Sequence, residues 1–60
     1  MITVKIAYKT IQPQLFSRFM KTNCNVGICH WKRINKEYYE ITFYDVPDVS
    51  LALKFIADFQ

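Results

Sequence analysis

Cys24, Cys29 and His30 are the residues of this sequence whose types could coordinate a metal ion or attack a substrate. Thiolate and imidazole groups are common zinc ligands, and a cysteine beside a histidine can act as a nucleophile. The spacing argues against both roles, because alternate positions of an extended strand project to opposite faces, which separates Cys24 from Cys29 and Cys29 from His30. We therefore expect free thiols, no metal site and no catalytic pair.

Other patterns that carry chemistry are also sparse. Glu37 and Glu40 flank a predicted hairpin, and Asp45 and Asp48 occupy positions typical of turns and helix caps. The single glycine, Gly27, cannot build a glycine-rich phosphate loop, and we expect it at a bulge or a close approach of two backbones. The sequence therefore predicts a protein that is not an enzyme and has no cofactor.

Composition indicates one small globular domain, residues 1–60. Hydrophobic residues make up 52 % and charged residues 22 % of the chain, which is too apolar for a disordered segment. The net charge of +3 favours phosphate or an acidic partner without requiring either. We see no secretory signal and no uncharged run long enough to span a bilayer, so we expect a cytoplasmic protein with no membrane partner.

The first half of the chain predicts a strand followed by a helix. Apolar side chains recur at every second position, at Ile2, Val4, Ile6 and Tyr8. This alternation predicts a strand over residues 2–10 with one apolar face. Pro13 suits the first turn of a helix, and the helical stripe that follows is Leu15, Phe16, Phe19 and Met20. Asn23 is expected to end this helix in the left-handed conformation.

Residues 25–34 and 37–45 predict a β-hairpin. We expect a two-residue turn at Asn35 and Lys36, which sets Ile34 opposite Glu37. In that register one face of the hairpin carries Val26, Ile28 and His30 with Tyr39, Ile41 and Phe43. The other face carries Gly27, Cys29, Trp31 and Arg33 with Tyr38, Glu40, Thr42 and Tyr44.

The last segment predicts a second helix, which Asp48 caps at its N-terminus. Its apolar side is Val49, Ala52, Phe55, Ile56 and Phe59. The element order is then β-α-β-β-α, an α+β two-layer sandwich with a three-stranded antiparallel sheet and two helices on one face. With the third strand between the other two, it looks like a truncated ferredoxin-like fold that lacks the last strand.

This layout leaves the first strand, with Ile2, Val4, Ile6 and Tyr8, at an open sheet edge. Such an edge can pair with another chain, so we expect either a homodimer or strand addition by a protein partner. The alternative is that Lys5 and Lys9 guard the edge with charge.

The layout also leaves one sheet face without helices. We expect five side chains there to contact a partner: Lys5, Trp31, Arg33, Tyr38 and Tyr44. Tyrosine, tryptophan and arginine dominate protein interfaces, which favours a protein-binding module. The alternatives are a single-stranded nucleic-acid (RNA) binder that stacks bases on the same aromatics, and aromatic pairs that only stiffen the sheet.

The run Tyr39-Glu40-Ile41-Thr42-Phe43, followed by Asp45, Asp48 and Leu53-Lys54-Phe55, resembles the C-terminal half of short accessory proteins of tailed bacteriophages. Those proteins carry a similar strand, an acidic turn and an apolar final helix. The resemblance implies a small early protein that binds a host macromolecule as an inhibitor or modulator. It transfers no catalytic residue to this sequence.

Overall fold

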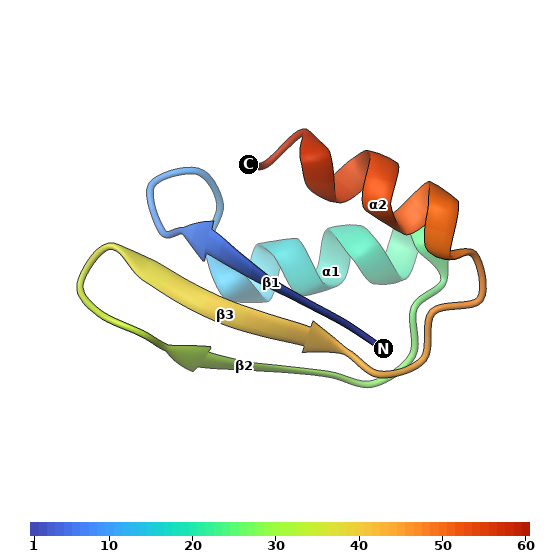
Figure 1. Ribbon diagram of the computed structural model, residues 1–60, viewed down its shortest axis with the longest axis horizontal. Coiled ribbons are helices and arrows are strands. Elements are labelled where there is room, and N and C mark those ends of the chain that lie inside the picture. Colours follow the sequence, from blue (N-terminus) through green and yellow to red (C-terminus); the bar gives the residue numbers. More distant parts are fainter.

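The computed structural model describes residues 1–60 and contains five elements in the predicted order. They are β1 (Ile2–Ala7), α1 (Pro13–Cys24), β2 (Cys29–Arg33), β3 (Tyr38–Phe43) and α2 (Val49–Ala57). The strands form one open antiparallel sheet in the order β1-β3-β2, with both helices on one side of it (Figure 1). The prediction of a small α+β protein is therefore confirmed.

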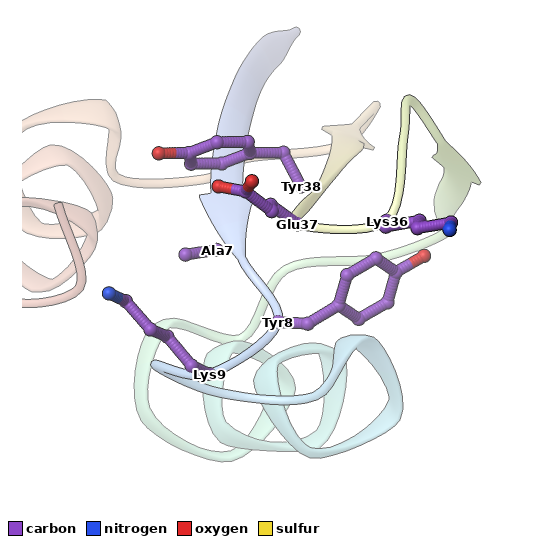
Figure 2. Close-up of a pocket in the computed structure, with 6 residues that line it drawn as sticks. All are labelled: Ala7, Tyr8, Lys9, Lys36, Glu37 and Tyr38. Atoms are coloured by element: carbon purple, nitrogen blue, oxygen red, sulfur yellow. The ribbon is translucent and has the colours of Figure 1, made fainter.

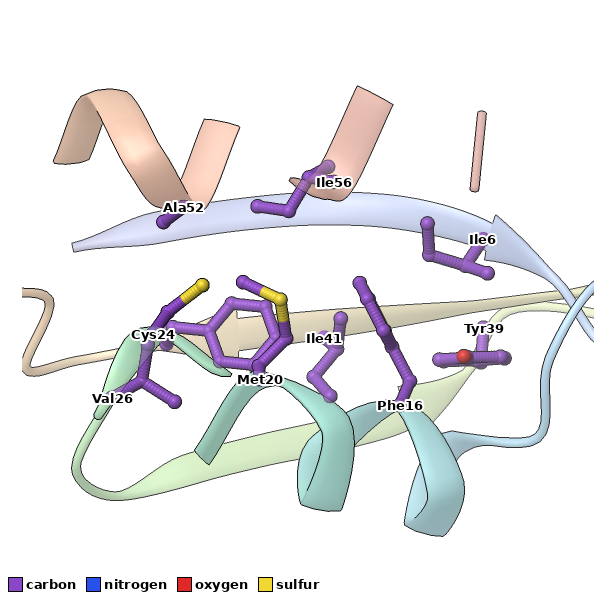
Figure 3. Close-up of a cluster of buried hydrophobic side chains, with 10 residues drawn as sticks. Ile6, Phe16, Met20, Cys24, Val26, Tyr39, Ile41, Ala52 and Ile56 are labelled. Atoms are coloured by element: carbon purple, nitrogen blue, oxygen red, sulfur yellow. The ribbon is translucent and has the colours of Figure 1, made fainter. Parts of the chain in front are cut away.

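The core lies between the sheet and the two helices. Its ten buried residues are Ile6, Phe16, Met20, Cys24, Val26, Tyr39, Ile41, Phe43, Ala52 and Ile56 (Figure 3). Phe16 of α1 meets Phe43 of β3 edge to face, with ring centroids 5.6 Å apart. The two helices contact each other through Phe19 of α1, whose ring packs against Phe55 and Phe59. Apolar burial is the main favourable term in folding, so these contacts hold the two layers together.

Two of the three predicted helix ends are confirmed. Pro13 begins α1, and the Asp48 carboxylate accepts a hydrogen bond from the Leu51 N–H at 3.0 Å, which caps α2 as predicted. The predicted cap at Asn23 is wrong, because α1 continues to Cys24 and Asn25 takes the left-handed conformation with φ of 53°. Asn23 remains helical, and its side-chain amide donates to the Phe19 carbonyl.

The first strand is shorter than predicted, since β1 ends at Ala7 rather than at Thr10. The Ala7 carbonyl accepts hydrogen bonds from the N–H groups of Thr10 and Ile11, at 3.0 Å and 3.4 Å. These bonds close a turn over residues 8–10 and lead the chain out of the sheet and up to α1.

The predicted hairpin register is wrong by one residue. Ile34 pairs with Tyr38 rather than with Glu37, because the connection holds three residues, Asn35 to Glu37. The Asn35 side chain shapes this loop by accepting hydrogen bonds from the backbone N–H groups of Glu37 and Tyr38. A two-residue primed turn needs positive φ angles, and no residue of this loop has one.

A shift of one residue turns every side chain of a strand to the opposite face. Cys29, Trp31 and Arg33 therefore lie opposite Phe43, Ile41 and Tyr39 on the helix side of the sheet. The Trp31 ring packs against the Tyr39 ring with centroids 6.0 Å apart, so the prediction that Trp31 and Arg33 lie on the open face is wrong.

The same shift places residues of the β2 segment that were expected on the inner side of the sheet on its outer side. His30 lies opposite Thr42 on the open face, and Ile28 is 76 % exposed. Val26 was predicted on the inner face together with Ile28 and His30, and it alone of the three is buried. It lies in the irregular segment ahead of β2, so the shift of the strand register does not turn it outward.

Gly27 lies at a close backbone approach, as predicted. Its N–H donates to the Asp45 carbonyl at 2.8 Å, and a Cβ at this position would meet the Asp45 Cβ at 2.9 Å. The glycine thus lets the segment before β2 lie against the segment after β3.

Candidate functional site

The outer edge of β1 exposes backbone groups that no strand pairs. The Tyr8 N–H donates to the Glu37 carbonyl at 2.9 Å, which fixes the alternation of hydrogen bonds along the β1–β3 ladder. Ile2, Val4 and Ile6 accordingly direct their backbone groups toward β3. The intervening residues direct theirs to the open side, and they are Thr3, Lys5 and Ala7.

These outward groups are partly occupied at one end of the strand. The Ala7 carbonyl is used by the turn, and the Gln60 side-chain amide lies 3.5 Å from the Lys5 carbonyl. A separation of 3.5 Å marks a weak hydrogen bond. Both backbone groups of Thr3 and the N–H of Lys5 have no partner, so the free part of the edge is centred on residues 3–5.

An apolar flank of α2 lies above this edge. Ala52 and Ile56 face the core, and Phe55 and Phe59 face α1, so helical geometry turns Val49 and Leu53 away from α1. α1 lies over β2, where its Ser17 contacts Cys29, which leaves α2 over β1 (Figure 3).

Val49 is 48 % exposed, although the sequence predicts it on the apolar side of this helix, and Leu53 is 49 % exposed. On β1, the strand beside this helix (Figure 3), Ile2 and Val4 are only partly buried against the core. We call the free edge of β1 together with Val49 and Leu53 the β1 groove. Edge polar groups and aliphatic side chains in this arrangement fit an extended polypeptide strand.

The two lysines expected to guard the edge lie away from its free part. The Lys5 ammonium lies over the Tyr38 ring, 4.6 Å from its centroid, so it points across the open face toward β3. Lys9 lies in the turn after β1, beyond the free part of the edge. Neither charge covers the backbone groups of Thr3.

The open face of the sheet has apolar ends and a polar middle. Thr3 and Thr42 share a hydrogen bond of 2.9 Å, and the Lys32 ammonium lies 3.6 Å from a Glu40 oxygen. Of the predicted contact residues, Lys5, Tyr38 and Tyr44 lie on this face, with the two tyrosines at opposite ends of the β3 segment.

The aromatic platform expected from the sequence is therefore not assembled. Trp31 and Arg33 lie on the helix side, and the polar rows separate Tyr38 from Tyr44. Binding of single-stranded nucleic acid stays a prediction, and on this face it would depend on two isolated tyrosines.

A shallow pocket opens where the turn after β1 approaches the hairpin loop. It has a volume of about 370 Å³ and is lined by Ala7, Tyr8, Lys9, Lys36, Glu37 and Tyr38 (Figure 2). Two lysines and one glutamate supply charges of both signs at its rim.

The two cysteines are free thiols, Cys24 buried and Cys29 partly buried. Burial raises the pKa of the Cys24 thiol, and the nearby Asp48 charge raises it further, so this group stays protonated and unreactive at neutral pH. Cys29 lies 2.8 Å from the Ser17 hydroxyl. No three histidine, cysteine or acidic side chains come together in a way that could hold a metal ion.

Comparison with protein-family models, with curated proteins and with solved structures gives no match for this chain. Neither helix has the length and apolar character that crossing a bilayer demands.

Proposed function

We propose that this protein is a small binding module that recruits another polypeptide by strand addition in the β1 groove. The observation that carries the proposal is the coincidence of two features: the unpaired backbone groups of Thr3 with the unpaired N–H of Lys5, and the exposed aliphatic flank of Val49 and Leu53 on α2, the helix that lies beside β1 (Figure 3). Backbone hydrogen bonds supply affinity in strand addition, and alternate side chains in a groove supply specificity.

The role that we propose is non-enzymatic, because the supporting features are an edge and an apolar flank rather than reacting side chains. The element order and the strand order β1-β3-β2 support the description as a ferredoxin-like sandwich in which the position beside β1 is open. Two free thiols are in keeping with the expected cytoplasmic setting.

The resemblance to phage accessory proteins would make the partner a host protein whose activity is inhibited or modulated. The open face of the sheet, expected as a second contact surface, is not part of this proposal, because Trp31 and Arg33 lie on the other face.

The test removes one backbone donor without changing any side chain. A chain of 60 residues can be made by chemical synthesis, which allows N-methylation of Lys5 on the β1 edge and, as a matched control, of Trp31 on the β2 edge. The probe is a library of labelled decapeptides with aliphatic residues at alternate positions, titrated against nanomolar protein by fluorescence anisotropy.

We expect the tightest peptides of this library to lose at least tenfold in affinity when Lys5 is N-methylated and to be unaffected when Trp31 is N-methylated. Absence of any saturable peptide binding would overturn the proposal. Equal losses for the two N-methylated chains would also overturn it, because the β1 groove would then have no special role.

A further inference from the structure

We propose that the strand added in the β1 groove is β1 of a second copy of this chain, so that two sheets join edge to edge about a two-fold axis. This inference rests on the proposed function and names its partner. Its basis is that β1 has the pattern that the groove selects, with aliphatic residues on the helix side and polar residues on the open side.

A symmetric pair requires that the edge be complementary to itself. Thr3 and Lys5 both direct their backbone groups outward, so Thr3 of one copy can exchange both backbone hydrogen bonds with Lys5 of the other, and the Thr3 N–H replaces the weak contact of the Gln60 amide at the Lys5 carbonyl. Symmetry then repeats this pair. The two-fold axis passes between the two Val4 residues and is perpendicular to the sheet, which keeps all four helices on one side.

The helix side of this register is aliphatic throughout. Val4 lies opposite Val4 of the second copy, and Ile2 lies opposite Ile6. Because α2 lies beside β1 (Figure 3) and turns Val49 and Leu53 away from α1, this register brings the two exposed flanks of α2 toward each other across the axis. Side chains that are half-exposed in the single chain thereby become part of a continuous core.

Two observations select this register over the one centred on Lys5. Centring on Lys5 would set the two lysines directly opposite each other, which is unfavourable in a strand pair. It would also ask the Ala7 carbonyl to accept from the second strand, although that carbonyl already accepts from Thr10. In the register centred on Val4, Lys5 lies opposite Thr3 and its ammonium stays over Tyr38.

The first experiment tests the register by oxidative crosslinking. In the non-hydrogen-bonded pair at the axis, the Cα atoms lie about 4.5 Å apart, within the range for a disulfide. The variant Val4→Cys should therefore form a covalent dimer within minutes of mild oxidation. The matched control Ile2→Cys should crosslink at least tenfold more slowly, because its position lies opposite Ile6, and peptide mapping identifies the bond in each case.

The second experiment tests the flank of α2 by sedimentation equilibrium. Leu53→Glu should weaken dimerisation at least tenfold, whereas Leu15→Glu should leave it unchanged, because Leu15 is similarly exposed (53 %) but lies on α1, away from the seam. Circular dichroism of both variants shows that they remain folded.

A chain that stays monomeric at millimolar concentration would overturn the second-copy inference, as would equal crosslinking of Val4→Cys and Ile2→Cys. In that event, peptide binding that is sensitive to N-methylation of Lys5 would still support strand addition by another partner. Two results together would overturn both proposals: no saturable binding of any peptide in the library, and a dimer whose dissociation constant Leu53→Glu does not change.

Discussion

The sheet has two open edges, and they differ in what surrounds them rather than in how many backbone groups they expose. At β1 the outward groups belong to Thr3 and Lys5, and the neighbouring helix α2 (Figure 3) exposes the aliphatic side chains of Val49 and Leu53. At β2 the outward groups belong to Cys29, Trp31 and Arg33, as the bond from the Ile34 N–H to the Tyr38 carbonyl shows.

The side chains beside the β2 edge offer little apolar surface to a second strand. Ser17 contacts Cys29, Trp31 folds onto Tyr39, and the Arg33 guanidinium donates to the Asn35 carbonyl. Charge and polarity next to an edge oppose pairing, whereas an aliphatic overhang favours it. Unpaired backbone groups alone therefore do not define a binding edge, and the neighbouring helix decides which edge is used.

The largest effect is expected at the loop that fixes β2. Asn35→Ala removes the side-chain oxygen that accepts hydrogen bonds from the backbone N–H groups of Glu37 and Tyr38. The loss of two hydrogen bonds should lower the free energy of unfolding by about 2–3 kcal/mol. Urea denaturation measures this loss.

The matched control for this variant is Lys36→Ala, in the same loop, whose side chain makes no hydrogen bond to the loop backbone. It should change the free energy of unfolding by less than about 0.5 kcal/mol. If Asn35→Ala is as well tolerated as the control, the Asn35 side chain does not fix the loop that sets the register of β2.

A smaller loss is expected where the chain enters β2. Gly27→Ala introduces a Cβ only 2.9 Å from the Asp45 Cβ, and we expect a loss of about 1–3 kcal/mol in the free energy of unfolding. The edge of β1 has no such constraint, so strain here should leave the β1 groove intact.

Thermal or urea unfolding of Gly27→Ala, Asp45→Gly and the double variant measures the coupling between these two positions. The double variant should recover part of the loss, because removal of the Asp45 Cβ relieves the contact. Strictly additive losses would show that the close approach is not the cause.

The smallest effect is expected at Tyr39, which lies on the strand between the two edges. Its hydroxyl donates to the Ile11 carbonyl at 2.9 Å, so Tyr39→Phe should lower the free energy of unfolding by about 1 kcal/mol at neutral pH. Burial, with a further contribution from Tyr8, raises the pKa of Tyr39 to about 12.

This shift also predicts a dependence on pH. Tyrosine in an unfolded chain ionises near pH 10, and the folded protein holds the proton more tightly. The contribution of Tyr39 to stability is then complete below about pH 10 and is lost as the pH rises from 10 through 12. The difference in the free energy of unfolding between the unchanged chain and Tyr39→Phe should narrow as the pH rises through this range. A constant difference would contradict the assignment of the raised pKa to Tyr39.

The sequence predicts the elements and their order well, because alternation in residues 2–8 and the stripes of the two helices are strong local signals. It fails at Asn35, where the turn type depends on a side chain that captures two backbone N–H groups. That one-residue error moved Trp31 and Arg33 to the wrong face and suggested an aromatic platform.

The flank of α2 was also missed as a candidate site. Val49 and Leu53 fit the apolar pattern of a buried stripe, and only the packing of Phe55 and Phe59 against α1 shows which way they turn. Val49 and Leu53 are four residues apart and so share one side of the helix, and Phe55 and Phe59 share another side in the same way. This spacing is the signal in the sequence that could have distinguished the two flanks of α2.

Residue-resolved amide hydrogen exchange at increasing protein concentration shows whether β1 or β2 is the edge that pairs. We expect the Thr3 and Lys5 amides to exchange rapidly in dilute solution and to become at least tenfold more protected as concentration rises, whereas the Trp31 and Arg33 amides stay rapid throughout. Protection that develops at Trp31 and Arg33, or at neither edge, would contradict pairing through β1.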